Sequence, residues 1–384
     1  MAGKEKAPRK PIKFRWGSMD LEFFIIILCL MTFGLVMMFS ASYSWGYYEG
    51  DSLFYIKKQL TVAGVGLIGM MAISMCDYHF LRKRWVVFGF FGVAFFLLIL
   101  VLIIGKVING AQRWIYIGSI SFQPSEIMKL AMIILFSYII SVNYKKMKYF
   151  QYGIVPFLVI MGLVAGLMML QPHLSGTVIM FAIGATMMFV GGTKRQHIVM
   201  LVIIAAVIIL IAVFILMQIK GIGYFETRIQ SWLNPDSDPQ GETYQTRQSL
   251  ITIGSGGMFG LGLGNSRQKF RYLPESHNDF VFSIVCEELG FVGAMLVIIL
   301  FVLFILRGFK IAAKAKDKFG MLLATGITVQ IGLQALLNIA VVTNSIPNTG
   351  ISLPFFSYGG TALILQLCEM GIILNISKQG NLDT

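Results

Sequence analysis

Residues 267–280 read RQKFRYLPESHNDF, and an unbroken apolar run follows them at once. This short polar stretch contains six ionisable side chains: Arg267, Lys269, Arg271, Glu275, His277 and Asp279. Ionisable groups beside a membrane-length apolar segment cost free energy unless they are paired or hydrated, so their presence indicates a functional site. We expect Asp279, at the mouth of an apolar helix, to carry the chemistry. The alternative is an ordinary hydrated loop end.

The composition places the chain among polytopic membrane proteins. Of its 384 residues, 57% are hydrophobic and 13% are charged, whereas soluble domains contain about 25% charged residues. The net charge of +13 could suggest a nucleic-acid partner. However, the basic residues form short clusters between apolar runs, which is the pattern that sets membrane topology. We therefore expect no nucleic-acid partner. The four isolated cysteines have no CxxC or metal-like spacing, and we predict no disulfide.

Ten apolar segments predict an all-α integral membrane protein with ten transmembrane helices. They are residues 21–39, 60–75, 86–104, 125–142, 152–170, 175–192, 197–219, 279–306, 319–342 and 354–376. Every short basic cluster falls on one side if the N-terminal tail is cytoplasmic, which predicts an N-in, C-in topology.

This topology divides the chain into three parts. Residues 1–18 form a basic cytoplasmic tail, residues 19–378 form the membrane domain, and residues 379–384 form a short cytoplasmic end. A large extracytoplasmic loop, residues 220–278, lies between helices 7 and 8. The shorter outer loops are residues 41–59, 105–124 and 343–353.

Two outer segments combine charges with helix signals. Glu126 and Lys129 follow Pro124 at a spacing of three, so they share one face of the first turns of a helix. They support a site or simply pair with each other to orient the helix. Arg113, next to Trp114, is placed to reach a phosphate at the membrane interface. His173, in the QPHLSGT stretch at 171–177, has either a polar role or only a place in a helix-connecting turn.

Three further stretches favour structure over chemistry. The glycine-rich stretch ITIGSGGMFGLGLGNS at 251–266 lacks the features of a nucleotide site, so closely packed or re-entrant backbone is expected. Residues 224–233 predict an interfacial helix. In IPNTGISLPFFSYGGTALI at 346–364, prolines and glycines exclude a straight helix; Ser357 and Tyr358 point toward an outer cavity. Glu287 and Glu288 are expected to hydrogen-bond neighbouring helices.

Together these stretches resemble the SEDS family (shape, elongation, division and sporulation). The matching stretches, in the family's order, are FSAS at 39–42, AQRWI and QPSEIMK within 111–129, QPHLSGT at 171–177, YLPESHNDFVFSIVCEELGFVGA at 272–294 and TGISLPFFSYGGTAL at 349–363. One motif alone would be weak evidence, but five in order cover nearly the whole chain. The residues HNDFVF and NTGISLPFFSYGG and the basic N-terminal tail resemble the FtsW/SpoVE branch more than the RodA branch.

The resemblance implies a peptidoglycan glycosyltransferase that polymerises lipid II at the outer face of the bacterial cytoplasmic membrane, for septal or sporulation wall synthesis. It implies that Asp279 is the essential residue and acts as general base, with His277 and Glu275 as weaker candidates beside it. Undecaprenyl diphosphate is then the leaving group. It also maps the family's supporting residues onto Arg113, Glu126 and Lys129. Many members have an acid where this chain has His173.

The resemblance further implies partners and counterions. A class B penicillin-binding protein, which is a transpeptidase, and other divisome proteins are the implied partners. The cations expected to neutralise the diphosphate are Arg113, Lys129, Arg247, Lys269 and Arg271. A divalent cation, Mg²⁺ or Mn²⁺, could share that work. Three alternatives stay open: a lipid II flippase or transporter, a RodA-type elongation polymerase, and a non-catalytic scaffold.

Overall fold

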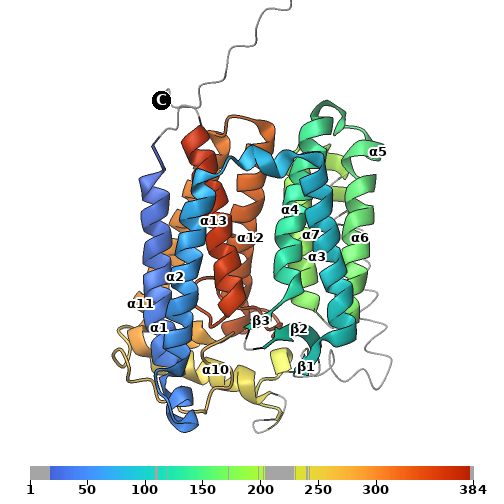
Figure 1. Cartoon of the computed structure of the whole chain (residues 1–384). Coiled ribbons are helices and arrows are strands. Elements are labelled where there is room, and N and C mark those ends of the chain that lie inside the picture. The colour runs from blue at the N-terminus through green and yellow to red at the C-terminus, as the bar shows by residue number, and fades with distance from the viewer. Residues whose placement is uncertain are drawn as a thin grey trace, which may run out of the picture.

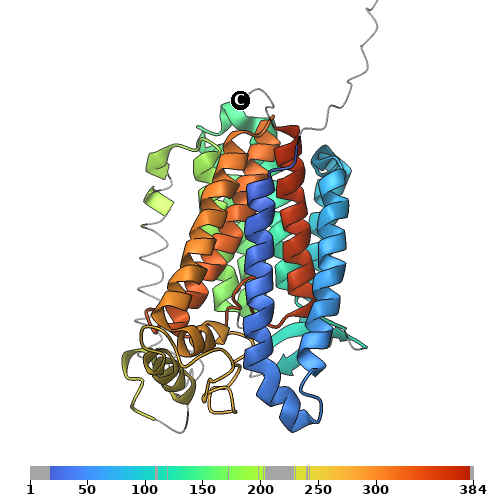
Figure 2. The same ribbon diagram turned by 90° about the vertical axis from the view of Figure 1, so that its left-hand side faces the viewer.

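The protein is a bundle of long, roughly parallel helices (Figures 1 and 2). The computed structural model describes residues 18–108, 111–118, 120–171, 173–197, 199–201, 203, 229, 231–238, 241 and 243–380. Among them, eight helices are long and apolar enough to span a membrane. The long helices are α1 (Leu21–Glu49), α2 (Phe54–Met75), α3 (Arg84–Ile104), α4 (Pro124–Asn143), α6 (Val155–Leu170), α11 (Val281–Ala313), α12 (Lys318–Val342) and α13 (Gly360–Gln379). A short helix, α5 (Phe150–Gly153), directly precedes α6 within one of these spans.

The remaining elements are shorter. They are the apolar helix α7 (Leu174–Val190), α10 (Tyr244–Ser255), the 3₁₀ turns η1 (Tyr78–Arg82) and η2 (Tyr144–Lys146), and strands β1 (Lys106–Ile108), β2 (Ala111–Ile117) and β3 (Ile120–Phe122). The expected seventh span, residues 197–219, lies mostly outside the described residues, as does most of the interfacial helix expected at 224–233. Ten spans therefore stay a prediction.

The two ends of the bundle differ. At one end the described termini meet, because the backbone N–H of Asp20 donates to Ser377 Oγ at 3.2 Å. The loops before α3 and α12 meet there too, since the Tyr78 hydroxyl donates to Asp317 Oδ1 at 2.8 Å. The sheet and α10 lie at the opposite end (Figure 1). The segments expected on the cytoplasmic side thus share one end, although which end faces the cytoplasm stays a prediction.

The described membrane spans are all-α as predicted, but the predicted outer loop at 105–124 is not irregular: it forms a three-stranded antiparallel sheet with the order β1-β2-β3. β2 pairs Gln112 with Val107 on one side and Tyr116 with Ser121 on the other. β2 reads AQRWIYI, and its β-branched and aromatic residues suit a pleated, half-exposed surface. The sheet places Arg113 beside the start of α4.

Several predicted helix ends are also wrong. α1 runs ten residues past the expected end at residue 39, because Ser40 to Glu49 contains no proline and the helix accommodates its one glycine, Gly46. It stops at Gly50, which adopts φ 95°, a left-handed conformation that glycine enters without strain. The expected outer loop 41–59 is therefore mostly helical. α13 begins at Gly360 instead of residue 354, since Pro354 and the glycines keep the preceding segment irregular, as expected.

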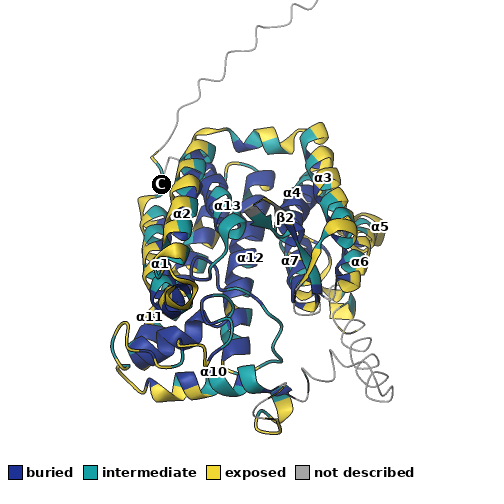
Figure 3. Ribbon diagram, turned by 60° about the horizontal axis from the view of Figure 1, so that its bottom comes forward, coloured by how far each residue is buried: buried dark blue, intermediate teal, exposed yellow. Residues whose placement is uncertain are grey.

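Burial is highest in the centre of the bundle, where α4, α12 and α13 lie (Figure 3). Outer helices such as α3 expose apolar side chains on their flanks, as lipid-facing helices do. α12 carries three buried amides, Gln330, Gln334 and Asn338, inside this centre. Buried amides in a membrane span need hydrogen-bond partners, and theirs define the site described below.

Candidate active site

Asp279 lies two residues before α11, and the backbone around it is held rigidly. Three successive carbonyls each accept one hydrogen bond from another segment. Tyr358 N–H donates to the carbonyl of His277 at 2.8 Å, and Ser357 Oγ donates to that of Asn278 at 2.6 Å. Asn338 Nδ2 of α12 donates to the carbonyl of Asp279 itself at 2.7 Å. The position of Asp279 is therefore fixed by α12 and by the segment before α13.

The Asp279 carboxylate faces the segment between α12 and α13. A Cβ atom built on Gly350 would lie 3.3 Å from Asp279 Oδ2, and Gly350 adopts φ 67°. The same segment is tied to Asp279 through Asn338, whose Nδ2 also donates to the carbonyl of Ile351 at 2.6 Å. Glycine thus leaves room next to the carboxylate and tolerates the left-handed backbone.

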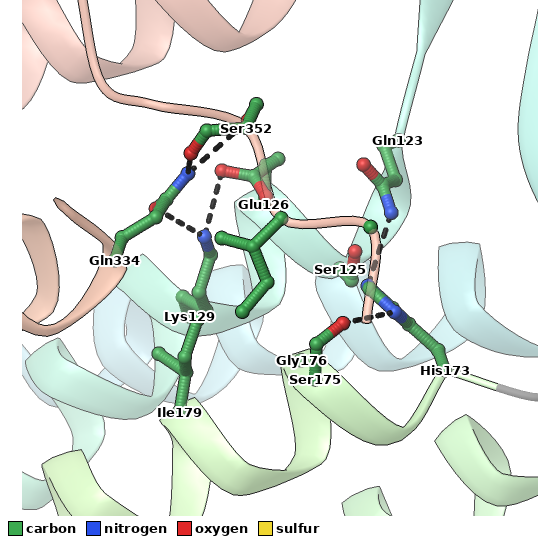
Figure 4. Close-up of a pocket in the computed structure, with 12 residues that line it drawn as sticks. Gln123, Ser125, Glu126, Lys129, His173, Ser175, Gly176, Ile179, Gln334 and Ser352 are labelled. Carbon is green, nitrogen blue, oxygen red and sulfur yellow. Dashed lines mark hydrogen bonds and ion pairs between the residues drawn. The ribbon is translucent and has the colours of Figure 1, made fainter. Parts of the chain in front are cut away.

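Gly350 also lines a small, partly open cavity of about 30 Å³. α4 and α7 form two walls, and α12 with the segment after it forms the third (Figure 4). The lining residues are Gln123, Ser125, Glu126, Lys129, His173, Ser175, Gly176, Ile179, Gln334, Gly350, Ile351 and Ser352. Most of the lining side chains are polar, and such groups suit a hydrophilic ligand or water better than lipid chains, which offer no hydrogen bonds.

Lys129 is the cation inside this cavity. Its Nζ lies 2.8 Å from Glu126 Oε2 and donates to Gln334 Oε1 at 3.0 Å (Figure 4). The Lys129 side chain is only 3% exposed, so the ion pair replaces most of its hydration. An ammonium has three N–H donors, and these two contacts use two of them. One donor is left for a ligand oxygen.

A series of hydrogen bonds crosses the cavity from Gln123, directly after β3, to the segment beside Asp279. Gln123 Nε2 lies 3.0 Å from His173 Nε2, and Ser175 Oγ lies 3.4 Å from His173 Nδ1. Ser175 Oγ also donates to the carbonyl of Thr349 at 3.0 Å. Burial, together with the positive charge of Arg113 and Lys129, holds the pKa of His173 well below its usual value. His173 is therefore a neutral hydrogen-bonding link.

His277, two residues before Asp279, packs in an aromatic cluster. Its ring centroid lies 5.0 Å from that of Tyr55, 5.5 Å from Trp45 and 5.9 Å from Tyr358. Burial lowers the pKa of His277, and the carboxylates of Glu275 and Glu49 oppose this only in part. The imidazole is therefore neutral at pH 7 and packs as an aromatic ring.

Comparison with known proteins gives these features a context. A model of the cell cycle protein family FtsW/RodA/SpoVE matches residues 20–382. The chain belongs to this family. It is 44% identical to stage V sporulation protein E of Bacillus subtilis over 367 residues, 94% of this chain and 97% of that protein. It is 39% identical to a probable peptidoglycan glycosyltransferase FtsW of Geobacter sp. over 363 residues, covering 94% and 97%.

Solved structures of the family share the fold. A chain from a structure titled "Structural coordination of polymerization and crosslinking by a peptidoglycan synthase complex" matches with a TM-score of 0.79 and 26% identity, covering 96% of this chain and all of that one. The rod shape determining protein RodA of Thermus thermophilus matches with a TM-score of 0.67 and 25% identity, covering 97% of this chain and all of RodA.

The FtsW/RodA/SpoVE fold brings together some of the predicted site residues. Glu126 and Lys129 line the cavity, and Asp279 lies beside it. Arg113 Nε donates to the carbonyl of Gln171 at 3.4 Å, close enough to influence His173. Ser357 supports the Asp279 backbone through its hydroxyl, and Tyr358 does so through its N–H.

Other predicted site residues lie elsewhere. Lys269 is buried in an ion pair with Glu288, at 3.0 Å. Arg247, on α10, lies 3.0 Å from Asp236. The exposed Arg271 guanidinium stacks over the rings of Trp45 and Tyr48, at 5.2 and 4.6 Å. Glu275 accepts a hydrogen bond from Asn278 at 2.6 Å. None of these four predicted residues lines the cavity.

Sequence reasoning missed the amides of α12 and one acid of α13. Gln334 and Asn338 hold Lys129 and Asp279, and Gln330 donates to the buried Glu369 at 2.9 Å. A polar residue inside an apolar span was the available signal, because membrane interiors tolerate such residues only with partners. Glu288 confirms the prediction of a hydrogen bond to a neighbouring helix, since Ser40 of α1 donates to it at 2.6 Å. Glu287 instead accepts from the loop, from the Ser266 hydroxyl and from the Arg267 N–H.

Proposed function

We propose that this FtsW/RodA/SpoVE family member is a peptidoglycan glycosyltransferase that polymerises lipid II, with Asp279 as general base. The observation that carries the proposal is the placement of Asp279 against Gly350, at the edge of a polar cavity that contains one buried cation, Lys129. A carboxylate beside the cavity and a cation inside it suit a reaction that removes a proton at one point and releases an anion at another.

The reaction is a single displacement. The 4-hydroxyl oxygen of the acceptor sugar attacks the anomeric carbon of the donor, and its proton passes to the Asp279 carboxylate. The new C–O bond forms as the bond to the diphosphate oxygen breaks, so undecaprenyl diphosphate leaves with the electron pair. A single displacement inverts the anomeric carbon. Only one base is needed, because the diphosphate leaves without protonation.

The remaining N–H donor of Lys129 is placed to bind a diphosphate oxygen, with Glu126 and Gln334 orienting the ammonium. Arg113 is the second cation near the cavity and can bind a phosphate in bidentate fashion. Ser125 Oγ, which lines the cavity and has no hydrogen-bond partner among the described residues, adds a donor or an acceptor for a sugar hydroxyl. Lys269, Arg247 and Arg271 act as supporting residues outside the cavity.

A divalent cation, Mg²⁺ or Mn²⁺, is a separate proposal. The described residues contain no group of three or more His, Cys, Asp or Glu side chains that could hold a metal. These residues therefore do not fit a protein-held metal, and no step above passes through one. An ion that shared the diphosphate charge would take its ligands mainly from the substrate oxygens and water. Loss of activity in EDTA and its recovery with Mg²⁺ would test this.

The cellular setting follows from the family. We place the chain in the bacterial cytoplasmic membrane, with Asp279 at the outer face and a class B penicillin-binding protein as partner; the solved peptidoglycan synthase complex supports the partner. Septal or sporulation synthesis is favoured, because FtsW and stage V sporulation protein E are close relatives.

The test is polymerisation of purified lipid II in detergent, where no membrane gradient exists, with and without the partner. Wild type should form glycan strands, and Asp279→Ala should lose about 10²–10⁴-fold in rate. Asp51→Ala is the control, because Asp51 is an exposed acid between α1 and α2 and its ion pair with Lys57 lies at the surface. Its rate should equal that of wild type.

Two other outcomes would replace the proposal. A flippase would make no strands in detergent but would move lipid II across liposomes. A scaffold would make no strands, and Asp279→Ala would still support cell division. A RodA-type role would instead appear as rescue of elongation and not of division in cells.

A further inference from the structure

The loop between α10 and α11 presents an apolar tip to its surroundings. Phe259 is 82% exposed and Met258 59%, and Leu263 and Leu261 are 55% and 41% exposed. Contiguous exposed apolar side chains mark a contact surface. We propose that this tip, residues 258–263, inserts into the lipid leaflet at the Asp279 end of the bundle. The proposal does not depend on the reaction assigned to the protein.

Two polar contacts mark the membrane boundaries on α1 and α11. At one end Arg307 lies 2.9 Å from Asp20; at the other, Ser40 donates to Glu288 at 2.6 Å. Asp20 and Ser40 are 20 residues apart, and Glu288 and Arg307 are 19 apart. α11 bends at Gly290, whose φ of 67° is not helical, so the helical rise does not apply from Glu288 to Arg307. At a rise of about 1.5 Å per residue along the unbroken helix α1, Asp20 and Ser40 are separated by about 30 Å. This equals the thickness of a hydrocarbon core, about 30 Å.

The loop is attached to α11 at the second of these boundaries. Leu261 and Gly262 N–H groups donate to the carbonyls of Glu287 and Glu288, both at 2.9 Å. In return Phe291 N–H donates to the carbonyl of Gly257 at 2.9 Å, and Val292 N–H to that of Met258 at 3.2 Å. Irregular backbone tolerates membrane depth only where its polar groups are paired within the protein, and these bonds supply that pairing.

The apolar tip continues a lipid-facing surface. Phe291 and Val292, whose N–H groups bind the loop, expose 56% and 52% of their surface, and Leu296 one turn further along α11 exposes 50%. The side chains of the loop and of the helix therefore form one apolar band across the boundary. The exposed side chains of the band are all apolar, which a lipid leaflet requires, and the band continues the exposed apolar flank of a membrane-length helix, so lipid is the occupant that it fits.

The loop cannot slide away from α11, because glycines interlock the two. A Cβ atom on Gly256 would collide with the carbonyl of Cys286, and one on Gly260 with that of Glu288. Beneath the loop, Lys269 Nζ donates to Glu288 and to the carbonyl of Gly264, at 3.0 and 2.6 Å. Insertion of the tip thus sets the depth of the first turns of α11, which directly follow Asp279.

Spin-label accessibility tests the proposal on the full chain in lipid nanodiscs. Labels go on Phe259→Cys, on Phe291→Cys as the lipid-facing control and on Asp51→Cys as the water-exposed control. In each, the native cysteines Cys29, Cys76, Cys286 and Cys368 are replaced by alanine. We expect the label at position 259 to collide more with oxygen than with a water-soluble nickel chelate, as at position 291. The label at position 51 should show the reverse.

Two results would overturn the proposal. A label at position 259 that behaves like the one at position 51 would place the tip in water. A label shielded from both reagents would show that protein covers it, either another segment of this chain or a partner. If the cysteine-free background does not fold, Phe259→Trp in brominated-lipid nanodiscs replaces it. Fluorescence quenching above that of wild type supports insertion of the tip. Quenching equal to that of wild type refutes it.

Discussion

Gly350 decides how closely the segment before α13 approaches Asp279. A methyl group there would lie 3.3 Å from Asp279 Oδ2 on a backbone at φ 67°. We predict that Gly350→Ala lowers the polymerisation rate about 10–100-fold, since small displacements at a reacting group have effects of that size. Gly166→Ala, on α6 with open space around it, is the control and should keep full activity. Equal rates for the two variants would show that Gly350 does not position the carboxylate.

Substitution of Lys129 tests whether its ammonium group binds the diphosphate of lipid II. Lys129→Met should lower kcat/KM for lipid II about 10²–10³-fold, as the loss of one charge-stabilising donor does. The variant also leaves Glu126 as an unpaired acid, so Lys129→Met with Glu126→Gln serves as the folding control. If the double variant folds normally and regains activity, the ammonium has no role in the reaction. Thermal unfolding and initial rates on both variants measure this.

His277 makes stability dependent on pH. Burial lowers its pKa from the usual 6.5, so the folded protein favours the neutral ring more than the unfolded chain does. This contribution is complete above pH 6.5 and is lost as the pH falls through the lowered pKa. His277→Phe should therefore unfold at nearly the same temperature at pH 7 and lose less stability than wild type at pH 5. A larger loss in His277→Phe at pH 5 would contradict this.

At the scale of elements, the buried pair Lys269–Glu288 joins the loop after α10 to α11 and α1. Glu288 is fully buried and Lys269 is 3% exposed, so removing one partner leaves a buried charge. We predict that Glu288→Leu costs about 3–5 kcal/mol of stability. Lys269→Met with Glu288→Leu should recover most of that loss, which unfolding in detergent would measure. A double variant no more stable than Glu288→Leu would exclude an ion-pair role.

The sequence predicted helices best where apolar runs were long and bounded by charge, as in α3 and α12. It failed at α1, where Ser40 to Glu49 has polar residues and one glycine but no proline, so the helix continued past the end of the apolar run. It failed also at 105–124, where strand pairing between β1, β2 and β3 depends on partners that single-sequence patterns do not reveal. Periodicity locates buried faces, whereas pairing is a property of the folded chain.

At the scale of the whole molecule, the site is assembled from segments far apart in the chain. Asp279, Glu126 and Lys129 were predicted as chemically active types, but sequence could not separate Lys129 from Lys269. Both are lysines near acids; only packing shows that one lines a cavity and the other is buried under a loop. Asn338 and Gln334 were missed because their roles arise from contacts across the bundle.

The most direct measurement is the single-turnover rate of glycosidic bond formation from lipid II by Asp279→Asn. The amide keeps the size and the backbone contacts of the side chain but cannot accept the proton. We predict a fall of at least about 10²-fold, with an unfolding temperature equal to that of wild type. Bond formation at the wild-type rate by the folded amide variant would contradict the assignment of Asp279 as the base.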